Sequence, residues 1–280
     1  MGREHALLFA ARGARVVVND IGGAVDGTGS SVGPAQAVVD EIVAAGGMAV
    51  ADTHSVATPE GGRAVIETAL AAFGRADIVV NNAGILRDKA FVNLSEDDID
   101  SVLNVHLKGA FNLTQPAWSF MRKQEYGRIV MTSSAAGLLG NFGQANYGAA
   151  KMALVGLANV LAIEGAKHNI KSNVIAPLAR TRMTEDVLGS LRDSVDPLLV
   201  SPLVAWLCHE DCPVSGHVYS VGGGRVARLF VGMGSGWVRT DGTLTIEDVR
   251  DHFAEMDDTS AATVPETLTD DIRALARALR

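Results

Sequence analysis

Residues 128–151 read RIVMTSSAAGLLGNFGQANYGAAK, and this stretch decides the fold of the chain. Its first five residues are an apolar, β-branched run typical of a buried strand, and a turn of small residues follows from Ser133. A segment of helix-forming composition opens at Tyr147. Strand, turn and helix in this order indicate one unit of a parallel β-sheet covered by helices.

The same alternation of short apolar runs and helical segments extends over most of the chain. The expected strands are residues 15–19, 48–51, 77–80, 128–132, 171–175 and 217–221. The first three lie about 30 residues apart, a spacing suited to βαβ crossovers. The Gly- and Ser-rich residues 22–33 indicate a loop beyond the first strand. We therefore expect an α/β fold with a doubly wound, Rossmann-like parallel sheet.

Composition narrows the class of protein. The 280 residues are 48% hydrophobic and 20% charged, as in a soluble globular domain with one substantial core. The net charge of −8 comes without basic clusters, so we expect neither nucleic-acid nor membrane binding. A chain with two cysteines, no secretory signal and no run of about 18 apolar residues is expected in the cytoplasm.

Cys208 and Cys212 flank His209, which raises the question of a metal site. A closed zinc site needs four ligands, and only His217 lies nearby in sequence. We therefore expect a packed helix end here and no metal.

Beyond residues 222–224 the alternation stops. We expect a dehydrogenase-like domain over residues 1–225 and an extension over residues 226–280, with helices beginning near Thr245 and Thr269, both as caps. In the last helix Ile272, Leu275 and Leu279 share one face. The extension is therefore expected to pack on the core or on a partner subunit.

Tyr147 and Lys151 are four residues apart in a helical segment, so their side chains share one face. A cation about 4–6 Å from a phenol favours the phenolate and lowers the tyrosine pKa from its usual value near 10. Tyr147 is then suited to exchange a proton with a substrate oxygen while a hydride moves to or from a nicotinamide. Ser134 would hold that oxygen. Chance occurrence of the spacing is the alternative, which Ser134 at the same sheet edge disfavours.

The cofactor side is indicated by Asp20, at the end of the first strand. Its carboxylate suits the ribose hydroxyls of NAD and would repel the 2′-phosphate of NADP. A turn-capping Asp is the alternative. After another strand, Asn82, Ala83 and Gly84 form a small-residue turn over which adenosine and its ribose can lie, Gly84 permitting close backbone approach.

Residues 81–84 (Asn-Asn-Ala-Gly), Ser134, the pair Tyr147 and Lys151, and Pro177 after a strand together resemble the short-chain dehydrogenase/reductase family over residues 2–225. This resemblance implies that Asn104 is a fourth catalytic residue, which holds a helix carbonyl and a water that relays protons through Lys151.

The same resemblance assigns the cofactor contacts. They are Asp20, Ser55, Val56, Asn82, Ala83, Gly84, Tyr147, Lys151, Pro177 and Thr181. Ser55 and Val56 would meet the adenine, whereas His54 stands where these relatives usually carry Asp. Residues 178–184 would hold the nicotinamide amide and the phosphates, and the stretch through residue 197 would be a substrate lid.

Residues 19–23, 83–91, 180–186 and 207–212 also resemble the (3R)-hydroxyacyl-CoA dehydrogenase unit of peroxisomal multifunctional β-oxidation enzymes and their bacterial single-domain relatives. A 3-hydroxyacyl thioester substrate and NAD are implied. Other secondary alcohols or ketones are the alternatives, as in a 3-oxoacyl-carrier-protein reductase or a hydroxysteroid dehydrogenase. Small and apolar residues in the helices of 96–121 and 149–165 predict a homodimer or homotetramer.

The beginning of the chain departs from the family pattern. The family opens with a central strand and a T-G-x-x-x-G-x-G turn that binds pyrophosphate at a helix N-terminus. Residues 1–3 match only the end of that turn. Because each unpaired buried backbone group costs about 1–3 kcal/mol, we expect a weakened sheet and hypothesise that translation starts upstream of Met1. An upstream reading frame without the strand and the glycine motif contradicts this hypothesis, and a non-catalytic oligomerising scaffold is the alternative.

Overall fold

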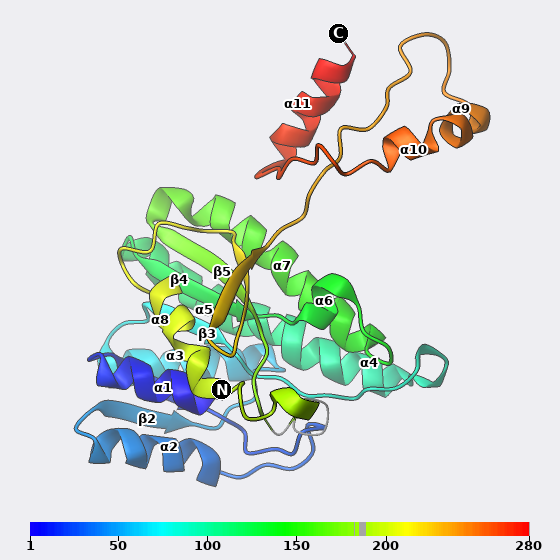
Figure 1. Cartoon of the computed structure of the whole chain (residues 1–280). Helices are drawn as coiled ribbons and strands as arrows, with labels where there is room; N and C mark the ends of the chain where they lie inside the picture. The colour runs from blue at the N-terminus through cyan, green and yellow to red at the C-terminus, as the bar shows by residue number, and fades with distance from the viewer. Residues whose placement is uncertain (182, 185–188, 280) are drawn as a thin grey trace. The chain divides into compact units, whose positions relative to one another are not determined.

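The structure is a computed structural model that describes residues 1–181, 183–184 and 189–279. The chain divides into two compact units, Met1–Arg228 and Leu229–Arg280 (Figure 1). This boundary falls later than residue 225, because strand β7 (Arg225–Leu229) joins the sheet of the first unit.

The first unit contains two groups of strands. In one group β1 (Arg15–Asn19) pairs with β2 (Met48–Asp52). The other group has the order β3, β4, β5, β6 and β7, with parallel pairing from β3 to β6. The bounds of its first four strands are Ile78–Asn81, Gly127–Thr132, Ile170–Pro177 and Val218–Gly222. Every expected strand is present within two residues of its expected bounds, and the doubly wound α/β fold is confirmed.

Helices cover both faces of these strands. Their bounds are α1 Gly2–Ala11, α2 Gly33–Ala44, α3 Pro59–Phe73, α4 Glu96–Leu103, α5 Gly109–Lys123, α6 Ala135–Leu139, α7 Ala145–Gly165 and α8 Ser201–Leu207. On one face, α8 packs its Val204 and Leu207 with Val130 of β4 and Ile175 of β5. The helices α5 and α7 contact β4 as well, and side chains of alternate residues on a strand point to opposite faces.

The strands β4 and β5 form the centre of the core. Every residue of β4 is buried, and so is nearly all of β5. A parallel strand covered by helices on both faces has no side that meets water, which explains the apolar runs at residues 129–131 of β4 and 174–176 of β5.

The sheet is divided between β1 and β3, as the departure at the beginning of the chain predicts. Among the residues that the structure describes, β1 pairs only with β2, and β3 pairs only with β4. Helix α1 packs against strands of both groups. Its Ala6 and Ala10 lie in a cluster with β1, and its Phe9 lies in a cluster with Val80 of β3.

The helical segment expected at residues 96–121 is interrupted. A π-helical turn, η2 (Asn104–Lys108), separates α4 from α5. Such insertions are rare in helices and frequent at functional sites. The turn therefore draws attention to Asn104 and to the buried His106 two residues later.

One segment, Ala145–His168, is long and apolar enough to cross a membrane by length and composition. It contains α7, which packs on β4 and β5. A third of the segment's most apolar window is buried, and core helices of other proteins pass the same test. This is weak evidence for a membrane span. The sequence predicts none, because it lacks a run of about 18 apolar residues.

The second unit is built from short helices. They are α9 Ile246–Asp251, α10 Phe253–Met256 and α11 Leu268–Ala278. Thr245 caps α9 as expected. Helix α11 begins one residue before Thr269, as expected, but the expected cap is wrong: Thr267 caps the helix through a reciprocal pair of bonds with Asp270. The shared face of α11 is exposed, with Leu275 59% accessible.

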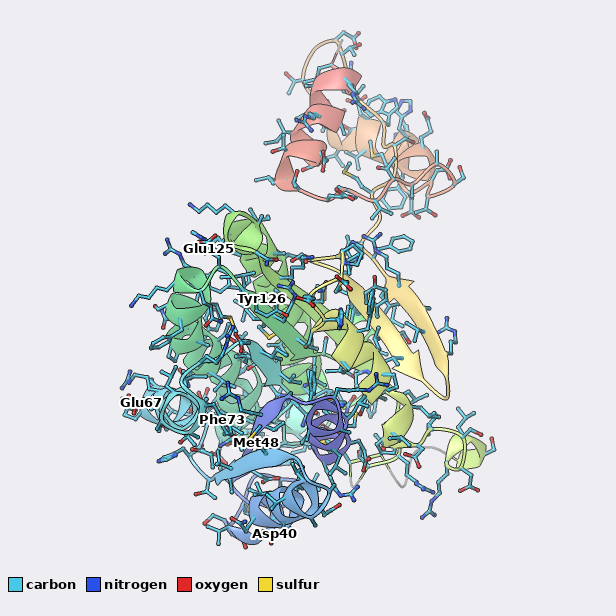
Figure 2. All side chains as sticks on the ribbon, turned by 90° about the vertical axis from the view of Figure 1, so that its left-hand side faces the viewer. Asp40, Met48, Glu67, Phe73, Glu125 and Tyr126 are labelled. Carbon is cyan, nitrogen blue, oxygen red and sulfur yellow. The ribbon has the colours of Figure 1, made fainter. Side chains whose placement is uncertain are left out.

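Arg128, at the start of β4, is a buried cation that is only 1% exposed. It ties several loops to the sheet. Its guanidinium donates to the carbonyl oxygens of Asn169 at 2.8 Å and of His209 and Glu210 at 3.2 Å. The guanidinium carbon lies 4.3 Å from the ring centroid of Tyr126, which Figure 2 labels at the connection between α5 and β4. Cation–π attraction adds to the hydrogen bonds.

Replacing this arginine is expected to destabilise the first unit. Arg128→Leu leaves several buried carbonyl groups without donors, so the free energy of unfolding should fall by about 3 kcal/mol or more. Urea denaturation followed by circular dichroism measures the change. Arg63→Leu is the matched control, because its side chain is half exposed and its ion pair with Glu60 lies on the surface. A loss below about 1 kcal/mol for Arg128→Leu contradicts the role assigned to this cation.

Candidate active site

The residues expected at the site follow the strands of both groups. Asp20 follows β1, Ser55 follows β2, Asn82 follows β3, Ser134 follows β4, and Pro177 ends β5. Because β1 runs parallel to β2, and β3, β4 and β5 run parallel to one another, these residues lie at the carboxyl edges, where ligands bind in open α/β sheets.

Ser134 begins helix α6 directly after β4. Its hydroxyl accepts a hydrogen bond from the amide of Ala136 at 3.2 Å and so caps the helix. The preceding Ser133 donates from Oγ to the carbonyl oxygen of Lys151 at 2.7 Å. This bond ties α7 to the end of β4 and brings Lys151 to the edge that carries Ser134.

Tyr147 lies in the first turn of α7. Asn146 fixes that turn: its Oδ1 accepts from the amide of Tyr147 at 2.8 Å. Its Nδ2 donates to the carbonyl oxygens of Arg87 at 3.1 Å and of Asp98 at 3.0 Å. Asn146 could not be predicted from the sequence, since a single Asn beside a tyrosine carries no signal until its partners are placed.

Lys151 is buried one turn further along α7. Its Nζ donates to the carbonyl oxygen of Thr132 at 2.5 Å and lies 5.4 Å from the ring centroid of Tyr147. Burial disfavours the ammonium and lowers the pKa of Lys151 from its ordinary value of 10.5 to about 7.

The protonation expected for Tyr147 is wrong in direction. Burial raises the pKa of its phenol, a nearby Asp88 carboxylate adds to the rise, and a hydrogen bond with Ser134 acts against it. The expected lowering of the Tyr147 pKa relied on a charged Lys151. Burial also lowers the pKa of Lys151 and so disfavours its charged form. Tyr147 is therefore a neutral phenol near pH 7 and is suited to donate a proton.

The structure places Asn104 at the first position of η2, and η2 contacts α7. Its carbonyl oxygen accepts from the amide of Gly109. Its part in a proton relay stays a prediction.

Asp20 uses one carboxylate oxygen to cap a turn, as the alternative reading has it. Oδ1 accepts from the amide of Gly22 at 2.7 Å, and the amide of Asp20 donates to the carbonyl oxygen of Asp52 at 3.0 Å. This bond joins the ends of β1 and β2. It places Asp20 beside the segment that carries His54, Ser55 and Val56.

His54 contacts Asp52, with 3.0 Å between Nδ1 and Oδ2. The Ser55 hydroxyl accepts from the amide of Ala57 at 3.3 Å. Asn112 of α5 donates to the carbonyl oxygen of Val56 at 2.8 Å and so fixes this segment to α5.

The turn after β3 offers an unused polar atom. Oδ1 of Asn82 is buried and has no hydrogen-bond partner among the residues described. A buried acceptor without a donor fits a ligand hydroxyl, so the residues present fit a nucleotide cofactor at this turn. Ala83 is exposed at the same turn.

Gly84 has a second role that the sequence did not indicate. A Cβ added there would lie 2.4 Å from Cε1 of His106. The absence of a side chain is therefore required by the histidine ring, whatever lies on the other side of the turn.

Beyond Pro177, the Thr181 hydroxyl accepts from the amide of Met183 at 3.2 Å. Residues 182 and 185–188 of the expected nicotinamide segment and lid lie outside the described residues.

Cys208 and Cys212 are free thiols in the apolar cluster around α8, and the described residues contain no group of three or more His, Cys, Asp or Glu suited to a metal.

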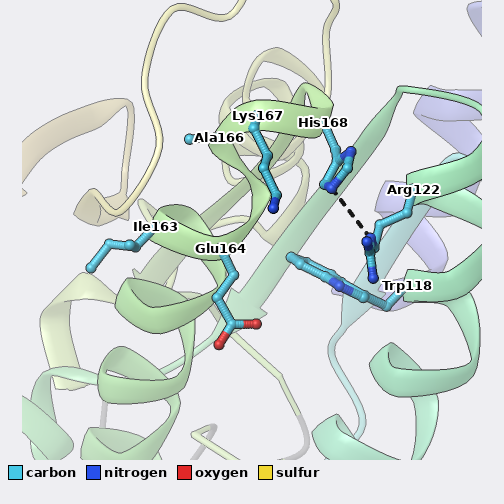
Figure 3. Close-up of a pocket in the computed structure, with 7 residues that line it drawn as sticks. All are labelled: Trp118, Arg122, Ile163, Glu164, Ala166, Lys167 and His168. Carbon is cyan, nitrogen blue, oxygen red and sulfur yellow. Dashed lines mark hydrogen bonds between the residues drawn. The ribbon is translucent and has the colours of Figure 1, made fainter.

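A hollow of about 480 Å³ lies elsewhere, between the ends of α5 and α7, with Trp118, Arg122 and His168 in its wall (Figure 3). Both helices end where β4 and β5 begin, so this hollow lies at the edge opposite Tyr147.

The family model described as short chain dehydrogenase matches residues 1–189. Since the match covers more than half of the chain, the chain belongs to the short-chain dehydrogenase family and is an oxidoreductase.

Individual proteins show how far the similarity extends. A peroxisomal multifunctional enzyme type 2 from Drosophila melanogaster is 53% identical over 266 residues, which are 94% of this chain and 44% of that protein. The hydroxyacyl-CoA dehydrogenase ChsB1 of Mycobacterium tuberculosis is 39% identical over 92% of this chain and 86% of its own. The crystal structure of a short chain dehydrogenase from Mycobacterium avium matches with a TM-score of 0.81 and 44% identity, over 91% and 90% of the two chains. The chain thus spans less than half of the multifunctional relative.

Proposed function

We propose that this chain is an NAD-dependent dehydrogenase that interconverts a 3-hydroxyacyl thioester and the corresponding 3-oxoacyl thioester. The observation that carries the proposal is the meeting of Ser134, Tyr147 and Lys151 at the carboxyl edge of β4. The substrate class is supported by the similarity to ChsB1, which is named a hydroxyacyl-CoA dehydrogenase.

The residues divide the reaction between them. The hydride that reduces the carbonyl carbon would be supplied by a bound nicotinamide cofactor, which would accept it in oxidation. The phenol of Tyr147 gives its proton to the carbonyl oxygen, which becomes the hydroxyl of the product. The Ser134 hydroxyl donates a hydrogen bond to that oxygen as its negative charge develops. Lys151 returns a proton to Tyr147, and that proton comes from solvent through a water that Asn104 would hold.

The cofactor would lie along the carboxyl edge. Asp20 accepts hydrogen bonds from the adenosine ribose, which favours NAD over NADP. The unpartnered Oδ1 of Asn82, beside Ala83 and Gly84, supports contact with the same nucleoside. Ser55 and Val56 would complete the cofactor surface at the adenine end. The nicotinamide end would be formed by Pro177 and Thr181, with Tyr147 and Lys151.

The surroundings of the enzyme are part of the proposal. Phe111 of α5 and Val160 and Ile163 of α7 are large exposed apolar side chains, which supports a homodimer or homotetramer formed through these helices. The free, buried thiols of Cys208 and Cys212 support a reducing cytoplasm.

The divided sheet favours one candidate of another class, a scaffold that keeps the fold without binding a nucleotide. Within the dehydrogenase class, a 3-oxoacyl-carrier-protein reductase or a hydroxysteroid dehydrogenase would use the same catalytic residues on a different ketone.

Removing the phenolic hydroxyl of Tyr147 is expected to abolish most of the activity. Tyr147→Phe keeps the ring but not the proton, so kcat for reduction of acetoacetyl-CoA by NADH should fall by about 10²–10⁴-fold. Loss of NADH absorbance measures the rate, and Tyr219→Phe on β6 is the control for the same chemical change. A Tyr147→Phe rate within about threefold of the wild type contradicts the proposal. A folded wild type that releases no heat with NADH in calorimetry supports the scaffold.

The charge of Asp20 is expected to set the cofactor preference. Asp20→Asn keeps an oxygen to cap the amide of Gly22 but removes the charge that repels a 2′-phosphate. The ratio of kcat/KM for NADPH to that for NADH should rise about tenfold or more. Asp40→Asn on the exposed surface of α2 is the control. A wild type that already prefers NADPH contradicts the assignment of NAD.

A further inference from the structure

His106 is a buried titratable residue that the proposed reaction does not use. It lies on the π-helical turn η2 and is 4% exposed. Asn104, the expected fourth catalytic residue, begins the same turn. The π-helical insertion therefore sets two polar side chains beside α7, and only one of them has a role so far.

One side of the ring holds the turn after β3. Nε2 of His106 lies 3.1 Å from the amide nitrogen of Ile85 and 2.8 Å from its carbonyl oxygen. Depending on the tautomer, this nitrogen accepts from the amide or donates to the carbonyl. The close approach of Gly84 to Cε1 seats the turn directly on the ring. His106 thus fixes the backbone that carries Asn82.

Another side of the ring meets the proton donor. The rings of His106 and Tyr147 lie edge to face, with centroids 5.3 Å apart and planes at 88°. This geometry is the favoured one for aromatic pairs, and it restrains both the position and the tilt of the phenol.

The choice of a histidine is not explained by packing. Burial, with a contribution from the charge of Lys151, lowers the pKa of His106 to about 3, so the ring is neutral at pH 7. Its Nδ1 is buried without a hydrogen-bond partner among the described residues. Such an atom costs stability that an aromatic hydrocarbon would not, whereas Nε2 alone supplies the bond to Ile85.

We propose that His106 is a positioning residue that fixes the ring of Tyr147 relative to the turn of residues 82–85. It holds the turn through Nε2 and the phenol through its ring, and it touches no reacting atom. The role rests on the proposed function, because it acts through Tyr147 and through the turn expected to hold the cofactor.

Two substitutions separate the two contacts. His106→Gln places an amide near Ile85 but removes the ring beside Tyr147, so kcat should fall about tenfold to hundredfold while the KM for NADH stays within about twofold. His106→Phe keeps a ring but loses the bonds to Ile85, so the KM for NADH should rise about tenfold with a smaller change in kcat. His209→Gln, at a half-exposed histidine, is the matched control and should change neither.

Two further measurements need no activity. Amide hydrogen exchange at Ile85 should be about tenfold faster in His106→Phe than in the wild type, and nearly unchanged in His106→Gln. The ring resonances of Tyr147, assigned with Tyr147→Phe, should shift in His106→Gln because the neighbouring ring is gone, and less in His106→Phe.

The outcomes separate this proposal from the proposed function. An inactive wild type refutes the proposed function. The exchange and resonance measurements then still test whether His106 fixes the turn at Ile85 and the ring of Tyr147. Unchanged exchange at Ile85 in His106→Phe, or a wild-type kcat in His106→Gln, overturns the positioning role. If kcat falls and the KM for NADH rises by similar factors in both variants, in step with lower melting temperatures, the histidine is structural only.

Discussion

The ammonium of Lys151 is buried where α7 crosses the end of β4, and the arrangement of the site depends on how that group is held. Its Nζ donates to the carbonyl oxygen of Thr132, and its own carbonyl oxygen accepts from the hydroxyl of Ser133. The helix is thereby joined to the strand end by side chain and backbone together. Tyr147, one turn earlier, and Ser134, one residue later than Ser133, are brought to the same edge as a result.

The same burial decides the protonation of the pair. Lys151 is buried and Tyr147 is half-buried, so the neutral forms are favoured: the pKa of Lys151 falls and the pKa of Tyr147 rises. A neutral phenol beside a lysine that titrates near neutral pH is suited to give a proton to a carbonyl oxygen and to regain it. The opposite half of the site has a different constraint. Among the residues that the structure describes, no strand pairs with both β1 and β3, and α1 contributes side chains to the apolar clusters of both.

The strands, their order of appearance and the edge that carries Ser134, Tyr147 and Lys151 could be predicted, because each rests on a local pattern of apolar or small residues. The π-helical turn at Asn104 and the seat of Gly84 on His106 could not, since both depend on contacts between segments distant in sequence. The protonation of Tyr147 was misjudged for the same reason, as burial is a tertiary property. The cap of the last helix was misjudged despite a signal: Thr267 stands three residues before Asp270.

The most direct measurement of this account is the titration of Lys151 itself. In protein labelled with ¹³C at the Cε of its six lysines, the Cε resonance that Lys151→Met removes should titrate near pH 7. This result would show that burial against β4 controls the charge beside Tyr147. If that resonance instead titrates at the ordinary lysine value of 10.5, Lys151 is a permanent cation at neutral pH and the account of the site is contradicted.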